Sequence, residues 1–221
     1  MSTTIYGQFQ IFHQRTRRKP GENREDSVTD RAAAWGLLTE FTQSESLRKH
    51  ALAVEACMRA YARKFAAEGK IDPADEEKWA ITGLLHDFDY EKYPTAEEHP
   101  FVGNKILREK GYPEDVMRAI LSHANYSGLA RESLMEKALF ACDELSGLIT
   151  AATLVKPTKN IADLDAPSVR KKMKDKAFAR SVSREDITNG AQDLGVELMD
   201  HIAFCIEAMS AIAPTLGLAG A

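Results

Sequence analysis

The sequence predicts an all-α protein, in which a single bundle of helices follows a loose N-terminal tail. Apolar residues recur at intervals of three and four positions over most of the chain after Arg31, which is the period of an amphipathic helix. No run shows the sustained alternation of apolar and polar residues that a half-buried strand requires. With 221 residues, 44% hydrophobic and 28% charged, the chain has the size and composition of one globular domain.

The chain divides into a polar N-terminal tail, residues 1–31, and one helical domain, residues 32–221. The tail shows no sustained period, and acidic residues follow at once on its basic run at positions 15–19. Such mixed charge is typical of a solvated terminus, although an organelle-import signal or a nucleic-acid-binding arm would also carry basic residues.

Capping residues and glycines mark the ends of five helices in the first half of the domain. Ser44 or Ser46 would cap the second helix, and Gly69 would stop it. Pro73 suits the first turn of the third helix, and Gly111 separates the fourth from the fifth. The predicted helices cover residues 32–42, 44–68, 73–87, 101–110 and 113–123.

In the second half, the pattern predicts a long helix, a loop and three further helices. Pro157 ends the long helix within a loop-like stretch, 156–166. A short and very basic helix follows, and capping chemistry at Ser183 begins the next. The predicted helices cover residues 132–155 and 168–176, a segment from 183, and 195–212.

The bulk properties exclude several classes of partner. A net charge of -4 gives no overall attraction to nucleic acid or to an anionic membrane. No apolar run approaches the roughly 18 residues of a membrane-spanning helix, and the N-terminus lacks the apolar centre of a secretory signal. We therefore expect a cytoplasmic protein without a membrane or nucleic-acid partner, and the sequence leaves a homo-oligomer open.

The three cysteines, Cys57, Cys142 and Cys205, are odd in number and far apart in the chain, and each lies in an apolar helical context. We interpret them as small core residues of a reduced protein. Their spacing predicts neither a disulfide framework nor a cysteine-type zinc site.

Four of the six histidines form an ordered series with two aspartates, a set of residue types that is typical of a metal site. Imidazole nitrogen and carboxylate oxygen together suit divalent transition ions. A lone buried histidine is more often a hydrogen-bonded core residue, so the prediction depends on the whole set. The series consists of His50, His86, Asp87, His99, His123 and Asp143.

Helix geometry favours convergence of these side chains. His50 lies on the apolar stripe of its helix, so we expect it to point inward. Asp143 lies among apolar and small residues, where a carboxylate needs a compensating cation or hydrogen-bond donors. We expect one ion to be held by His50, His86, Asp87 and Asp143, with Asp87 bridging to a second ion at His99 and His123.

The series resembles the defining pattern of the HD-domain superfamily of metal-dependent phosphohydrolases. The similarity covers most of the chain after about residue 32. Within the superfamily, the chain more closely resembles a group of bacterial predicted hydrolases, and that resemblance extends to the basic segment 168–177. The segments that carry it are Gly83-Leu-Leu-His-Asp-Phe-Asp-Tyr90, His99-Pro-Phe-Val-Gly103, Ile120-Leu-Ser-His123 and Asp143-Glu-Leu-Ser-Gly147.

The resemblance implies an all-α core that holds one or two divalent ions, drawn from Fe, Mn, Co, Ni and Zn, with Mg also compatible. It implies that the first ion is held by His50, His86, Asp87 and Asp143, and that His99 and His123 hold the second. The chain departs from the superfamily in two places. Ala124 replaces the second histidine that members cleaving cyclic dinucleotides carry, and Asp89-Tyr90 replaces a glycine and a phosphate-binding lysine.

We therefore expect hydrolysis of a small phosphate ester, such as a nucleotide, by metal-activated water. Asp87 and Asp89 are the candidate catalytic residues, with Asp89 as general base or as the group that orients the water. An exposed loop carboxylate is the alternative role for Asp89. Lys156 and Lys159 are the candidate substrate-phosphate ligands, and the basic segment 170–176 is either a further phosphate site or a solvated helix face.

Two other functions are compatible with the sequence. Some HD-fold proteins resemble the same six-ligand series and use two irons to activate oxygen and cleave a carbon bond. The other alternative is that the chain is a non-catalytic ligand-binding module that contains a structural metal. The basic segment favours phosphate chemistry, and the intact ligand series favours an enzyme.

Overall fold

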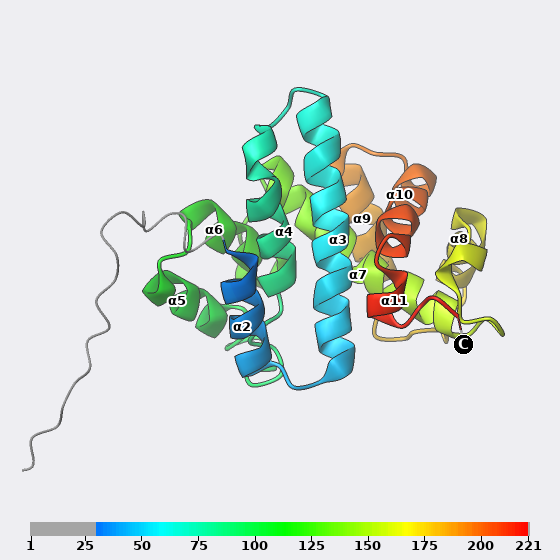
Figure 1. Ribbon diagram of the computed structural model, residues 1–221, viewed down its shortest axis with the longest axis horizontal. Coiled ribbons are helices and arrows are strands. Elements are labelled where there is room, and N and C mark those ends of the chain that lie inside the picture. Colours follow the sequence, from blue (N-terminus) through cyan, green and yellow to red (C-terminus); the bar gives the residue numbers. More distant parts are fainter. Residues whose placement is uncertain (1–29, 221) are drawn as a thin grey trace, which may run out of the picture.

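The computed structural model describes residues 30–220, and in that range the chain is a bundle of helices without a β-strand (Figure 1). One isolated antiparallel bridge joins Asn160 to Ala219. The all-α prediction is confirmed. The predicted tail lies outside the described residues except at its last two positions, where Asp30 caps the first helix and Arg31 begins it.

The first half of the bundle follows the predicted order of helices. The Ser44 side chain accepts a hydrogen bond from the backbone N–H of Leu47, which identifies Ser44 as the cap of the second one. The elements are α2 (Arg31–Phe41), α3 (Glu45–Ala67), η1 (Pro73–Asp75), α4 (Glu76–Leu85), α5 (Phe101–Lys110) and α6 (Glu114–His123).

The second half differs from the prediction at helix ends. The basic helix begins at Ala166, because Asp165 caps it and Pro167 is tolerated within the first turn. The predicted last helix is shorter, and a separate one-turn helix follows it. The elements are η2 (Asn125–Ser127), α7 (Leu134–Leu154), η3 (Ile161–Asp163), α8 (Ala166–Met173), α9 (Arg184–Leu194), α10 (Leu198–Ser210) and α11 (Ala213–Leu216).

The two long helices α3 and α7 form the centre of the bundle (Figure 1). Helices α2, α4, α5 and α6 lie on one side of this pair, and α8, α9, α10 and α11 lie on the other. The closest packing joins α3 to α4 and α7 to α9, and α10 contacts both central helices. Buried apolar side chains from these helices make one continuous core.

The contact between α3 and α4 depends on a glycine. A Cβ atom on Gly83 would lie 3.0 Å from the backbone nitrogen of Glu55 and 2.9 Å from the Cγ atom of Met58. No larger residue fits there without displacing α4. This close crossing brings His86 and Asp87, which follow α4 directly, against the N-terminal half of α3.

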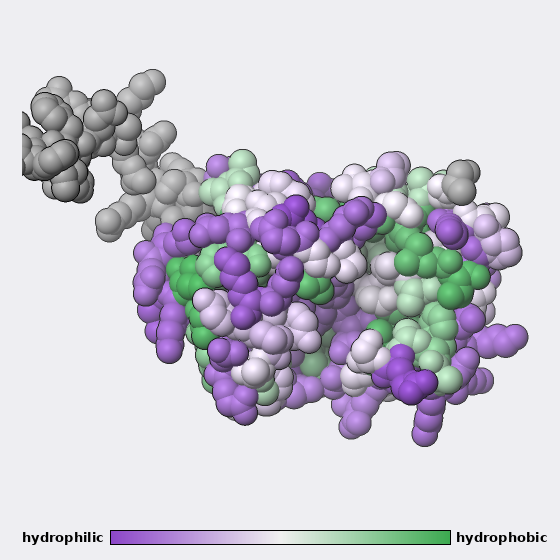
Figure 2. Space-filling model, turned by 90° about the horizontal axis from the view of Figure 1, so that it is seen from below, coloured by the Kyte–Doolittle hydropathy of each residue, from purple (hydrophilic) through white to green (hydrophobic). Residues whose placement is uncertain are grey.

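Hydrophilic residues cover much of the face that Figure 2 shows, and apolar residues gather toward its two ends. Within residues 30–220, no helix has the length and apolar character that crossing a lipid bilayer requires.

Candidate metal centre

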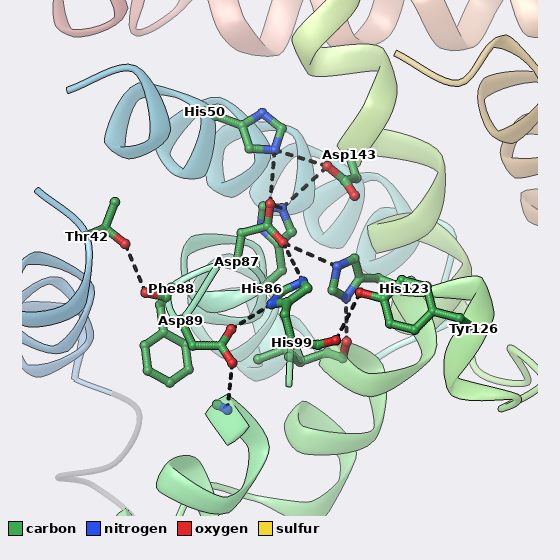
Figure 3. Close-up of polar contacts among 12 residues, drawn as sticks. Thr42, His50, His86, Asp87, Phe88, Asp89, His99, His123, Tyr126 and Asp143 are labelled. Carbon is green, nitrogen blue, oxygen red and sulfur yellow. Dashed lines mark hydrogen bonds and ion pairs between the residues drawn. The ribbon is translucent and has the colours of Figure 1, made fainter. Parts of the chain in front are cut away.

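The structure brings the four histidines and two aspartates of the predicted series together in one site (Figure 3). His50 comes from α3, and Asp143 comes from α7. The other four lie at or beyond helix ends: His86 and Asp87 directly after α4, His99 before α5, and His123 as the last residue of α6.

Asp87 lies at the centre of the site and belongs to two groups of donor atoms. Its Oδ2 atom faces the Nε2 atoms of His86, at 3.4 Å, and of His50, at 4.0 Å. Its Oδ1 atom faces the Nε2 atoms of His99, at 3.2 Å, and of His123, at 3.3 Å. Asp143 completes the first group with its Oδ1 atom 3.0 Å from His50 and 3.4 Å from His86.

Three of the histidines are oriented in the same way. Each points its Nδ1 atom at an oxygen that can only accept a hydrogen bond: the Gly83 carbonyl for His86, the Ile120 carbonyl for His123 and the Asp89 carboxylate for His99. Nδ1 must therefore carry the hydrogen. In a neutral ring, Nε2 then offers a lone pair toward Asp87, as metal-binding histidines do.

The His86 side chain shows most directly that a cation fits the site. Its Nε2 atom is buried and has no hydrogen-bond partner among the described residues, although it faces two carboxylates. A buried polar atom without a partner is costly in a folded protein. In each of the two groups, the donor atoms lie within 4.8 Å of one another, so a metal ion in each would satisfy them.

The charges of the site also favour a cation. Burial opposes ionisation of Asp87 and Asp143, but the imidazole of His86 and its neighbours hold the pKa of both carboxyls below the usual value. Burial likewise opposes protonation of His86, yet Asp87 and Asp143 outweigh it and raise the pKa of His86 well above normal. The site therefore concentrates ionised carboxylates that a divalent ion can neutralise.

The structure places Asp89 behind His99. Its side chain is 1% exposed. One carboxylate oxygen accepts a hydrogen bond from His99 Nδ1, and the other accepts from the backbone N–H of Gly103, both at 2.7 Å. Asp89 is therefore not an exposed loop carboxylate, and its two oxygens are occupied by these donors, whereas its role as general base remains a prediction. It orients His99 from behind.

A glycine at the start of α5 makes this support possible. A Cβ atom on Gly103 would lie 2.6 Å from the Cγ atom of Asp89, which is closer than any real Cβ contact. The chain therefore needs glycine at the third position of α5 so that its backbone can donate to the carboxylate.

A cavity of about 430 Å³ opens beside the metal donors. Tyr126 lies at its edge and donates a hydrogen bond from its hydroxyl to the carbonyl of His99, at 3.0 Å. Tyr90 packs edge-on against the His99 ring. Besides the donors, the lining includes Leu47, Tyr90, Ala124, Asn125, Tyr126, Phe140, Glu144, Gly147, Ser181, Val182 and Asp186.

Sequence patterns did not identify Tyr90, Tyr126 or Glu144 as site residues. Glu144 directly follows Asp143, and its carboxylate accepts a hydrogen bond from the backbone N–H of Ser183, at 3.1 Å. Burial, together with the charge of Asp143, raises the pKa of Glu144 to about 7. Two signals were available: Glu144 directly follows a predicted ligand, and Tyr90 occupies the position of the absent lysine. Tyr126 carried none.

Lys156 and Lys159, the predicted phosphate ligands, are not among the residues that line the cavity, and their role remains a prediction. Helix α7 continues beyond Asp143 to Leu154 and so carries the chain roughly 16 Å away from the site. The basic segment 170–176 does not reach the cavity either. Among the described residues, no lysine or arginine lines it.

Comparison with known families identifies this arrangement. The family model of the HD domain matches residues 47–148, a little under half of the chain. This segment is an HD domain. It begins in α3 just before His50 and ends in α7 just after Asp143, so it contains all six donors of the site. No curated protein and no solved structure matches the chain.

An HD domain with this donor set indicates a metal-dependent hydrolase. The HD domain accounts for the all-α core from α3 to α7. Helices α8 to α11 lie after it in the chain and pack against its two central helices.

Proposed function

We propose that the chain is a metal-dependent phosphohydrolase that cleaves a small phosphate ester with the help of one or two divalent ions. The observation that carries the proposal is the position of Asp87, which is shared by two groups of donors within an HD domain. Phosphate hydrolysis is the chemistry that such a paired arrangement of metal donors serves best.

The residues of the site divide into two ligand sets. His50, His86, Asp87 and Asp143 would hold one ion, and His99 and His123 would hold the other, with Asp87 between them. Nitrogen and oxygen donors in this ratio suit Fe, Mn, Co, Ni or Zn. When bound, the ions supply a water of lowered pKa and neutralise charge on the phosphoryl oxygens.

The protein residues fix the geometry of this chemistry. Asp89 and the carbonyls of Gly83 and Ile120 hold three imidazoles in place before the substrate arrives. Preorganised ligands of this kind need no rearrangement during the reaction. The hydroxyl of Tyr126 donates to the carbonyl of His99, and this hydrogen bond holds the ring at the edge of the cavity.

The cavity restricts the class of substrate. Its volume of about 430 Å³ suits a small molecule. Because no lysine or arginine lines it among the described residues, the ions themselves must neutralise the phosphate charge. Each further phosphate would lack a cation, so we expect a monoester such as a nucleoside monophosphate rather than a diphosphate or triphosphate.

The absence of lining cations among the described residues also supports a second candidate, a diiron oxygenase with an uncharged substrate. The donor set is compatible with two irons that share Asp87. This candidate requires iron as the metal and oxygen as the co-reactant. Iron content and oxygen uptake can both be measured.

The decisive experiment combines elemental analysis of the purified full chain with a panel of phosphate monoesters assayed with Mn, Co, Ni, Fe and Mg. We expect turnover with at least one transition ion and a preference for monophosphates. Anaerobic loading with iron, followed by electron paramagnetic resonance and oxygen-uptake measurements, tests the oxygenase. A mixed-valent diiron signal with oxygen uptake and no phosphate release would replace the first candidate by the second.

Asp87→Ala is the variant that tests the site. It removes the shared carboxylate, so we expect loss of bound ions at both positions and loss of activity. Asp163→Asn, which changes an exposed carboxylate in η3, is the matched control and should keep both. Turnover by Asp87→Ala at the wild-type rate would contradict the proposed function.

A further inference from the structure

Three buried thiols meet at a second place in the core, where α3, α7 and α10 are in contact. Cys57, Cys142 and Cys205 come one from each helix, and each has an exposed fraction of 0%. Their sulfur atoms all lie within 4.8 Å of one another. No sequence pattern predicted this convergence, since 85 and 63 positions separate consecutive members of the set.

The sulfur triangle has dimensions close to those of a metal site. A point at its centre lies no more than about 2.8 Å from each sulfur atom, whereas a zinc–sulfur bond is about 2.3 Å long. Small side-chain rotations therefore suffice to bring the three sulfurs to bonding distance. Thiolates are soft ligands that select zinc or Cu⁺ over harder ions.

A histidine beside the triangle provides an independent observation. His201 lies one turn before Cys205 in α10, and its Nδ1 atom is 3.7 Å from the Cys205 sulfur. Its Nε2 atom lies 2.9 Å from the carbonyl of Ala141, which can only accept, so Nε2 carries the hydrogen. Nδ1 then holds the lone pair, which currently accepts from the hydroxyl of Tyr61 at 2.6 Å. A ring N–H on a backbone carbonyl is the usual support of a metal-binding histidine.

We propose that Cys57, Cys142 and Cys205 form a structural site for a thiophilic metal ion such as Zn²⁺, separate from the histidine–aspartate centre. The site is closed on all sides, since none of its three side chains reaches solvent. An ion there would fasten α10, which lies outside the HD domain, to the two central helices. Because the site has no surface opening, the ion enters while the chain folds.

Cobalt absorption tests this site directly. The full chain is expressed in medium with Co²⁺ replacing zinc, and in parallel it is refolded from denaturant with Co²⁺ under reducing conditions. Sulfur-to-cobalt charge transfer absorbs strongly in the near ultraviolet, whereas cobalt bound by histidine and aspartate lacks this absorption. We expect the band in the wild-type protein and in Asp87→Ala, which leaves the thiols intact.

The cysteine variants provide the matched comparison. Cys142→Ser and Cys205→Ser should lose the band, and Met58→Leu, a core change next to Cys57 that keeps all three thiols, should retain it. Circular dichroism establishes that each variant is folded. The proposal is overturned if folded wild-type protein prepared by both routes shows no band, or if the band persists when Cys142 and Cys205 are both serine. Neither result would affect the proposed phosphohydrolase.

Discussion

Asp89 and His99 show how a residue outside the cavity can control a candidate ligand. The Asp89 carboxylate is almost completely buried, and it is held by one imidazole N–H and one backbone N–H. Burial opposes protonation of His99, but the carboxylates of Asp87 and Asp89 outweigh it and raise the pKa of His99 to about 9. Asp89 therefore orients this ring and, together with Asp87, raises its basicity.

Replacement of Asp89 by asparagine tests this role. The amide keeps the shape of the side chain, but it offers one acceptor oxygen for two donors, so either His99 or Gly103 loses its hydrogen bond. We expect metal affinity at the His99–His123 position to fall by about 10- to 100-fold. Isothermal titration with Mn²⁺ measures the two positions separately. The His50–Asp143 position serves as the internal control, and equal weakening of both would contradict a role confined to His99.

At the scale of helices, the site depends on how closely α4 approaches α3. Gly83 lies at the crossing, three residues before His86, and its carbonyl accepts the hydrogen bond from His86 Nδ1. The same short segment therefore permits the contact between the helices and orients the first imidazole.

Gly83→Ala is expected to destabilise the protein by about 1–3 kcal/mol, because the added methyl group overlaps the backbone of α3. Gly36→Ala in α2 is the matched control. A Cβ atom there meets nothing within 4 Å, and alanine favours a helix, so we expect stabilisation by about 0.5–1 kcal/mol. Urea unfolding of both variants gives the comparison. Equal stability of the two variants would show that the crossing tolerates a larger residue.

For the molecule as a whole, metal binding and stability are linked. Three of the six donors lie in α3, α6 and α7, and the other three lie between α4 and α5, so an ion held by these donors joins the two central helices to the α4–α6 side of the bundle. A ligand that binds only the folded state raises the free energy of unfolding.

We expect removal of metal by a chelator to lower the melting temperature. An ion present at 100 times its dissociation constant contributes about 2.7 kcal/mol, which corresponds to roughly 5–10 °C for a chain of this size. Calorimetry with and without Mn²⁺ measures the shift, and Mn²⁺ is too hard an ion to fill the thiol site. Asp87→Ala should show no shift, and a shift of wild-type size in that variant would place the stabilising ion elsewhere.

The division of the chain into residues 1–31 and 32–221 remains a prediction. The HD domain itself covers residues 47–148, and the described helices on either side of it pack against it. Asp30 and Arg31 belong to the first described helix and its cap, so this helix begins one residue before the predicted domain boundary.

The sequence by itself determined the helical class, the order of the helices and the series of six candidate donors that the structure brings together. These features depend on short-range rules: a residue's helical period, its capping neighbours and the chemistry of its own side chain. The series was recognisable because histidine and aspartate are unusual within apolar helices, so His50 and Asp143 stood out in their own segments.

Only the tertiary structure decided what lies beside those donors. It turned Asp89 away from the cavity, placed Lys156 and Lys159 beyond it, and brought Cys57 next to Cys205. The physical reason is the same in each case: each outcome depends on how the helices cross, which no local sequence rule describes. A helix advances only about 1.5 Å per residue, so a few positions along α7 separate a group in the site from one outside it. Helix crossing likewise joins thiols that no local spacing relates.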